Sequence, residues 1–170
     1  LQTSLPKTMD IRLSASMDLS TSDIGYIVSA IYVVSGLMNY VGGILADKYS
    51  EKIIYAIGII GQGSLLLLII SLSNYWLIAI CLIIVAFNSS ILPAENLLLA
   101  RFAPEKYQSL VYGIKFIISF SVGPIALILI SKSYELTNEF SYLYLASGVI
   151  MLLLFMVVLT LPVKKQALAT

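Results

Sequence analysis

Residues Asn39 to Lys52 have the sequence NYVGGILADKYSEK, an apolar stretch with two glycines that runs directly into a short charged turn. Apolar segments of membrane length lie on both sides of this turn, since ~30 Å of hydrocarbon requires about 20 helical residues at ~1.5 Å each. A charged loop this short holds its two flanking helices antiparallel, with the loop at one membrane surface. The stretch therefore predicts an all-α integral membrane protein.

The composition supports this fold class and argues against several classes of function. Hydrophobic residues make up 59% of the chain and charged residues 11%, which is about half the charge of a typical soluble domain. The net charge of +1 gives no electrostatic basis for binding nucleic acid. Histidine is absent and Cys81 is the single cysteine, so disulfides and His/Cys metal sites within the chain are excluded. No metal or other cofactor is predicted.

Five segments are long and apolar enough to cross a bilayer. Lysine and arginine are unevenly divided between the two sides that these segments define, and the richer side is expected to be cytoplasmic. Six basic residues lie on the side of the 47–52 turn and the C-terminus, and three lie on the other side. The predicted spans are residues 24–46, 53–72, 75–100, 110–131 and 141–161; the basic residues are Lys48, Lys52, Arg101, Lys106, Lys164 and Lys165 against Lys7, Arg12 and Lys132.

The expected organisation has three parts. Residues 1–20 form an outer segment, residues 21–163 a transmembrane helical domain, and residues 164–170 a cytoplasmic tail. An outside N-terminus without the apolar core of a signal peptide suggests that residues 1–20 include the end of a preceding helix. The alternative is a complete protein of five helices with a processed N-terminus.

Two stretches carry a family resemblance. Residues Gly43 to Lys52, GILADKYSEK, resemble the G-x-L-A-D-R-x-G-R-K signature of the major facilitator superfamily, although Ser50 replaces a glycine and Glu51 a base. Residues Ala103 to Pro124, APEKYQSLVYGIKFIISFSVGP, are similar to the family's last inside loop and the helix after it. The resemblance implies five helices of a six-helix half-bundle. The lack of an arginine in the third span and the short tail favour the C-terminal half.

The resemblance also implies a function and partners. Such a half rocks against an N-terminal half in the lipid bilayer, and alternating access moves a small-molecule solute, with protons as a candidate coupling ion. The alternative function is a non-transporting membrane assembly or scaffold subunit. An enzyme is disfavoured, because no histidine and no carboxylate pair at matching depth are present. Short loops favour a prokaryotic inner membrane.

The third span carries the strongest candidate site. Asn88 and Glu95 are seven residues apart and project from one helix face, and Ser89 and Asn96 form a second stripe beside them. Pro93 removes the amide that would bond the Ser89 carbonyl, which predicts a helix break in the form of a kink or a local opening. Interrupted helices recur at transporter binding sites. The alternative is a polar contact between helices with a harmless bend.

Two further spans contribute polar groups at mid-depth. Lys115 is expected at a depth similar to that of Glu95, and Asn39 lies in the first span. Lys115 suits an anionic solute and Glu95 suits a proton or a cation, but each also suits the other as its partner. Lys115 has a second alternative, in which its long side chain reaches the membrane surface.

The charged turn is a candidate conformational loop. Gly42 and Gly43 permit close helix packing, and Asp47, followed by Lys48, is expected to meet the N-terminus of a nearby helix. The family resemblance implies that this helix belongs to the other half. The alternative is a turn whose charges only keep it solvated.

Helix polarity predicts how the spans are arranged. The second and fifth spans are the most uniformly apolar and are expected to face lipid. The first, third and fourth carry small and polar residues and are expected to form the inner set. In the first span Ser29, Gly36 and Gly43 recur every seven residues, which places a packing face along that helix.

Overall fold

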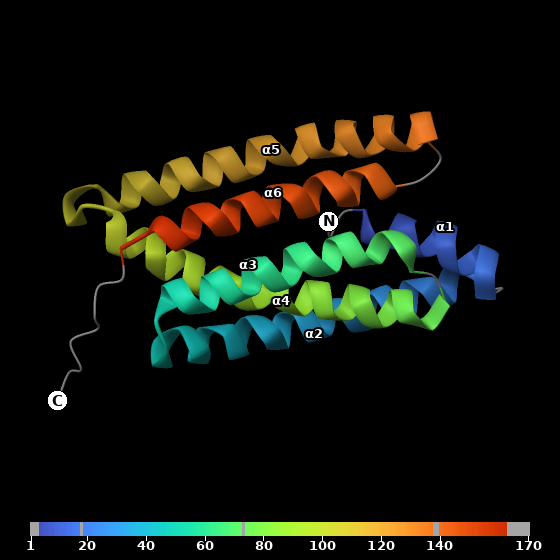
Figure 1. Ribbon diagram of the computed structural model, residues 1–170, viewed down its shortest axis with the longest axis horizontal. Helices are drawn as coiled ribbons and strands as arrows, with labels where there is room; N and C mark the ends of the chain where they lie inside the picture. The colour runs from blue at the N-terminus through green and yellow to red at the C-terminus, as the bar shows by residue number, and fades with distance from the viewer. Residues whose placement is uncertain (1–3, 18, 73, 138–139, 163–170) are drawn as a thin grey trace.

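The computed structural model describes residues 4–17, 19–72, 74–137 and 140–162, and these residues form helices and no strands (Figure 1). Five helices are long and apolar enough to cross a membrane, so the predicted all-α membrane fold is confirmed. In chain order the elements are α1 (Leu5–Met17), α2 (Thr21–Lys48), α3 (Glu51–Leu68), the 3₁₀ turn η1 (Ile69–Ser71), α4 (Asn74–Phe102), the 3₁₀ turn η2 (Glu105–Tyr107), α5 (Gln108–Thr137) and α6 (Ser141–Thr160).

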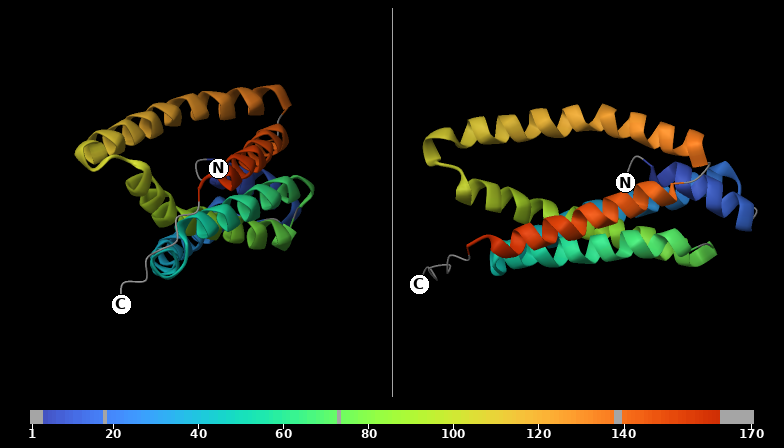
Figure 2. Two further views of the ribbon diagram at one scale, coloured as in Figure 1. Left: turned by 60° about the vertical axis from the view of Figure 1, so that its left-hand side comes forward. Right: turned by 45° about the horizontal axis from the view of Figure 1, so that its top comes forward.

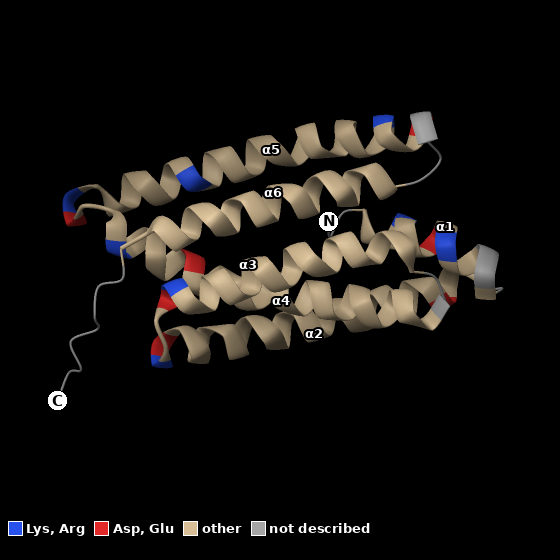
Figure 3. Cartoon of the chain, in the orientation of Figure 1, with Lys and Arg blue, Asp and Glu red and all other residues tan. Residues whose placement is uncertain are grey.

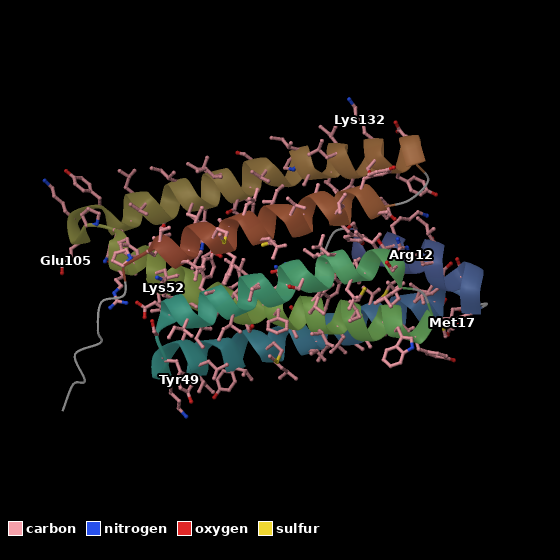
Figure 4. The ribbon with its side chains drawn as sticks, in the orientation of Figure 1. Arg12, Met17, Tyr49, Lys52, Glu105 and Lys132 are labelled. Atoms are coloured by element: carbon pink, nitrogen blue, oxygen red, sulfur yellow. The ribbon has the colours of Figure 1, made fainter. Side chains whose placement is uncertain are left out.

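The helices alternate in direction between two ends of the molecule. Tyr49, Lys52 and Glu105 lie at one end, and Arg12, Met17 and Lys132 lie at the other (Figure 4). Charged residues gather towards these ends and leave long uncharged stretches between them (Figure 3). The arrangement matches the alternation on which the basic-residue count depends.

The helix α2 begins and ends with residues suited to helix termini. Ser20 and Asp23 form a capping box, in which each side chain bonds the backbone N–H of the other residue. Lys48 lies in the last turn and Glu51 in the first turn of α3, where their charges suit the two helix dipoles. These polar end residues explain why α2 is longer than the apolar window 24–46.

Residues 5–17 form the short helix α1 within the expected outer segment. Leu5, Met9 and Leu13 recur every four residues and are completely buried. The helix packs on α2 and α4. The polar side of α1 is anchored too, because Thr8 bonds the hydroxyl of Tyr144 on α6.

The helix α4 lies at the centre of the bundle. Its most extensive contacts are with α2 and α3, and α3 in turn packs along α6 (Figure 2). Glycines permit these approaches: Gly58 of α3 faces Ile91 of α4, and Gly63 of α3 faces Gly148 of α6. By contrast, α5 contacts α4 and α6 through few residues, and none of its membrane-length window is buried.

The second span, which is expected to face lipid, has one buried and one exposed face. In α3, Ile59, Gln62 and Leu66 are fully buried between neighbouring helices, whereas Ile53 and Ile57 are exposed on the opposite face. Only this exposed face can meet lipid. Polarity did not reveal the buried face because apolar side chains suit both lipid and a helix interface; the glycines of α3 were the signal.

Two basic side chains fasten α3 and α6 at opposite ends. Lys52, at the start of α3, donates to the Leu159 and Leu161 carbonyls at the end of α6. Arg12 donates to the Ile69 carbonyl at the end of α3, 2.8 Å away, and to the Ser141 hydroxyl at the start of α6. Helix ends leave such carbonyls without intrahelical partners, so both contacts stabilise these termini.

The buried face of α3 gives a testable difference between two leucines. Leu66 is 1% exposed and Leu153 of α6 is 62% exposed. We expect Leu66→Ala to lower the free energy of unfolding by ~2–5 kcal/mol, because it leaves a cavity among packed helices. Leu153→Ala is the matched control and should change stability little. Reversible unfolding in detergent measures both, and equal losses would contradict the packing of α3.

Candidate functional site

Three of the predicted polar residues meet between α4 and α5. The Lys115 ammonium on α5 lies 2.9 Å from Glu95 Oε1 and donates to Asn96 Oδ1 at 2.6 Å. Tyr112, one turn before Lys115, donates its hydroxyl to the Asn96 backbone carbonyl at 2.7 Å. These bonds join α4 to α5 where the two helices otherwise have little contact.

The ion pair explains how two charged side chains are tolerated within membrane-spanning helices. A lone charged side chain near the bilayer centre costs about 2.5–3.5 kcal/mol on insertion scales. Glu95 and Lys115 offset each other's charge, and both side chains are partly exposed at 35% and 22%. The alternative in which Lys115 turns away to the membrane surface is not the arrangement in the structure.

A cavity of ≈ 270 Å³ lies beside this ion pair. Its polar lining consists of Tyr55 from α3 together with Glu95 and Lys115. Its remaining walls are apolar and come from the end of α4 and from the residue that follows α6. These apolar residues are Leu98, Leu99, Phe102 and Leu161. An opposed pair of charges, one hydroxyl and an apolar wall therefore share one space.

The remaining polar residues of the first and third spans lie elsewhere. The Ser89 hydroxyl is hydrogen-bonded to that of Ser35, which joins α4 to α2. Asn88 is half-buried and Asn39 is exposed, and neither side chain has a hydrogen bond to another described residue. Ser89 thus has a packing role in this arrangement, and the predicted stripe of Ser89 and Asn96 is divided, because Asn96 bonds Lys115 of α5.

The predicted kink or local opening of the helix at Pro93 stays a prediction. The helix α4 continues from Asn74 to Phe102 with Pro93 inside it. Packing on both sides of the preceding turn holds this path: Gly42 of α2 lies against the Ser90 backbone, and Gly58 of α3 lies against Ile91. The missing proline amide is therefore tolerated without ending the helix.

At the charged turn, the structure distinguishes neighbouring glycines. A Cβ placed on Gly42 would lie 2.2 Å from the Ser90 carbonyl oxygen, whereas nothing lies within 4 Å of one placed on Gly43 or Gly36. Of these three glycines, Gly42 is thus the one that packs closely against another helix of the described chain. The face that Gly36 and Gly43 share is open in the described residues.

Asp47 and Lys48 are both exposed, and neither side chain bonds another described residue. Asp47 borders a cavity of ≈ 430 Å³ between the ends of α2 and α4, together with Glu51 and Arg101. The partner expected for Asp47 belongs to the other half, so its predicted role stays a prediction.

The ion pair of Glu51 and Arg101 was missed from the sequence. The Arg101 guanidinium near the end of α4 bonds Glu51 at the start of α3, and the Glu51 side chain is 8% exposed. Both residues were interpreted only as loop charges. A signal existed, because both residues are expected at the same membrane surface and Glu51 departs from the base of the family signature.

Among residues 4–17, 19–72, 74–137 and 140–162, no three His, Cys, Asp or Glu side chains gather to hold a metal ion. The groups near Glu95 make an ion pair and hydrogen bonds.

Comparison with known families gives one match that covers nearly the whole chain. The family model described as Major Facilitator Superfamily matches residues 5–169. No curated protein gives a significant match. The family match agrees with the five membrane-length helices and with the charged turn between α2 and α3. The chain therefore belongs to the major facilitator superfamily, whose members are transporters that handle small solutes within a lipid bilayer.

Proposed function

We propose that this chain is the C-terminal half of a secondary active transporter, which moves a small solute by alternating access. The observation that carries the proposal is the Glu95–Lys115 ion pair beside a cavity with a mainly apolar lining. A charge pair within spans is expensive to maintain and marks an ion or solute pathway more often than a packing contact.

Unpartnered surfaces support a second half as the partner. The Gly36 and Gly43 face of α2 meets nothing in the described chain, and α5 exposes apolar side chains such as Phe116 and Phe120. Small residues let another helix approach closely. In this proposal α2 and α5 contact the N-terminal half, and Asp47 meets it at the cytoplasmic surface when the inside is closed.

The proposed orientation has the turn after α2 and the C-terminus in the cytoplasm of a prokaryotic inner membrane. Cysteines at Tyr49 and Glu105, in a Cys81→Ala background, should then react with an impermeant maleimide only in inside-out vesicles. A cysteine at Lys132 should react in intact cells. Labelling of all three from the same side would refute this topology.

Transport is tested by reconstituting the protein into proteoliposomes and offering it a range of solutes. A panel of anionic, cationic and neutral solutes is added, and an internal pH-sensitive dye reports coupled proton movement. We expect at least one solute to drive proton flux and to be concentrated by an imposed pH gradient. Absence of flux with every solute would favour the scaffold alternative.

Two carboxylate variants, one at Glu95 and a matched control at Glu105, test the coupling group with the same panel of solutes. Glu95→Gln keeps the shape and removes titration, so we expect concentrative uptake to be lost while exchange of solute at equal concentrations persists. Glu105→Gln, at an exposed carboxylate on η2, should transport normally. Full concentrative uptake by Glu95→Gln would eliminate Glu95 as the coupling group.

A further inference from the structure

A groove of ≈ 320 Å³ lies between α2 and α3, with α4 as its floor. Two glycines explain its shape. Gly42 of α2 lies against the Ser90 backbone and Gly58 of α3 lies against Ile91, so both helices approach adjacent residues of α4 while they make few contacts with each other. The floor between them consists of Leu82, Ile83, Ala86, Phe87 and Ser90.

The lining of the groove suits an apolar ligand. The side chains are almost all apolar, and the hydroxyl of Ser90 already donates to the Phe87 carbonyl at 3.0 Å. A water molecule held in the groove would need two or more polar partners, and a polar solute would lose its hydration without replacement. A hydrocarbon chain needs no hydrogen bonds and can contact every wall.

The groove opens toward the bilayer. Its rim on α3 includes Ile57, which is 55% exposed and belongs to the face of that helix that can meet lipid. On α2 the groove is lined by Met38 and Leu45, which lie two residues after Gly36 and Gly43. At 3.6 residues per turn this is a rotation of about 200°, so the groove and the glycine face lie on opposite sides of α2. The hydrocarbon available at this rim is a lipid acyl chain.

The length of the groove matches one leaflet. It extends from Met38 to Leu45 on α2 and from Leu82 to Ser90 on α4, which is ~10–12 Å at 1.5 Å per residue. Met38 lies ten residues, or ~15 Å, before Lys48 in the charged turn, and one leaflet is about half of the ~30 Å hydrocarbon thickness. The groove therefore belongs to the leaflet that meets the 47–52 turn, and it follows the helices across that leaflet as an acyl chain does.

The charged turn places a positive charge at the surface end of the groove. Lys48 lies three residues after Leu45, within about 60° on the same side of α2, and its exposed side chain bonds no other described residue. Asp47 instead lies four residues after Gly43, on the glycine face. Glu51 is buried in its ion pair at the end of α4. The charge offered to a head group above the groove is thus that of Lys48, and basic residues next to a membrane helix attract anionic lipids.

We infer that this groove binds one acyl chain of an anionic phospholipid, whose phosphate lies at Lys48. The inference goes beyond the proposed transport function, because it requires only the transmembrane fold. A protein that moves no solute would bind the lipid in the same way. The acyl chain fills the space that α2 and α3 leave over α4.

Quenching of tryptophan by lipids with dibrominated acyl chains tests the inference in vesicles. In a Trp76→Phe background an introduced tryptophan is the single one of the chain. Ile57→Trp reports from the rim of the groove, about 9 Å of helix from Glu51. Leu153→Trp reports from the exposed face of α6, about 10 Å from Thr160. The two reporters lie at similar depths from the same surface, and Ile57 alone of the two borders the groove.

Dibrominated phosphatidylglycerol or dibrominated phosphatidylcholine is added at low mole fraction to vesicles of unbrominated phosphatidylcholine. We expect the anionic lipid to quench Ile57→Trp with a binding constant about fivefold above that of phosphatidylcholine, because one lysine contacts its head group. At Leu153→Trp the ratio of the two binding constants should be about one. Equal quenching of Ile57→Trp by the two lipids, or the same preference at both reporters, would overturn the inference.

Two alanine variants, measured with the Ile57→Trp reporter, locate the acyl chain. Ala86→Phe fills the floor of the groove and should remove the preference for the anionic lipid. Ala79→Phe, at an exposed alanine seven residues earlier on α4 and outside the groove, is the matched control and should keep it. A preference that persists in Ala86→Phe would refute the groove as the site.

Two lysine variants locate the head group, and both change exposed side chains, so this comparison does not depend on the packing of the groove. Lys48→Gln should lower the ratio of binding constants at Ile57→Trp to about one. Lys106→Gln, on η2 near the same end of the molecule, should leave it unchanged. An equal loss in both variants would show a general attraction of the basic surface and would refute Lys48 as the residue that holds the phosphate.

Discussion

Replacing Gly42 with leucine is expected to abolish the folded state. The Cβ alone would lie 2.2 Å from the carbonyl oxygen and 2.6 Å from the Cα of Ser90. Both are backbone atoms in the middle of α4, so no rotamer change relieves the overlap. The interface of α2 and α4 is the most extensive in the structure, and separating these helices would expose the Ser35–Ser89 contact as well.

The adjacent glycine provides the control for this prediction. A Cβ on Gly43 meets nothing within 4 Å, so Gly43→Ala should leave the folded fraction unchanged. The measurement is the monodisperse fraction by fluorescence-detected size exclusion in mild detergent, followed by thermal unfolding. We expect Gly42→Leu to give aggregated or degraded protein, and Gly42→Ala to be visibly less stable than Gly43→Ala. Equal behaviour of the two alanine variants would contradict the helix contact.

The fold was largely predictable because membrane-length apolar segments leave few alternatives. Without water in the bilayer, backbone groups must bond within each segment, so five apolar runs become five helices. The charged turn at residues 47–52 was predicted to separate the first two spans, and α2 ends and α3 begins within it. The sequence did not reveal which helix faces pack together. Leu66 lies in a helix interface and Leu153 lies on the surface, although both belong to equally apolar sequences.

The sequence predicted which polar residues belong to the candidate site, but it did not predict which neighbouring helix each of them contacts. Glu95, Asn96 and Lys115 stood out because charged and amide side chains are rare within spans, and the structure brings them together. Helix periodicity grouped Ser89 with Asn96, yet Ser89 faces α2, since a bundle helix has neighbours on several sides. Tyr55 had no signal at all, because its place at the cavity depends on how α3 packs.

The buried ion pair of Glu51 and Arg101 is the second site where a large effect is expected. The Glu51 side chain is 8% exposed and that of Arg101 25%, at the point where α3 begins and α4 ends. Glu51→Gln removes the carboxylate and leaves the guanidinium partly buried. Removal of one partner from a buried ion pair typically destabilises by ~3–5 kcal/mol, and the partial exposure of Arg101 places this case near the lower value.

A double-mutant cycle isolates the contribution of that ion pair. Arg101 makes further contacts, so Arg101→Met alone reports more than the loss of Glu51. The cycle with Glu51→Gln cancels those contacts, and we expect a coupling energy of at least ~1 kcal/mol from unfolding in detergent. The exposed ion pair of Lys7 and Asp10 on α1, at 3.1 Å, is the control and should give a coupling of ~0–0.5 kcal/mol.

Equal coupling in the two cycles would mean that burial does not strengthen the Glu51–Arg101 ion pair. A strong coupling would instead identify this ion pair as the contact that fixes the start of α3 against the end of α4. Both helices supply walls of the cavity at Glu95, through Tyr55 and Phe102. Loss of Glu51 should then also weaken solute binding at Glu95, although Glu51 does not line that cavity.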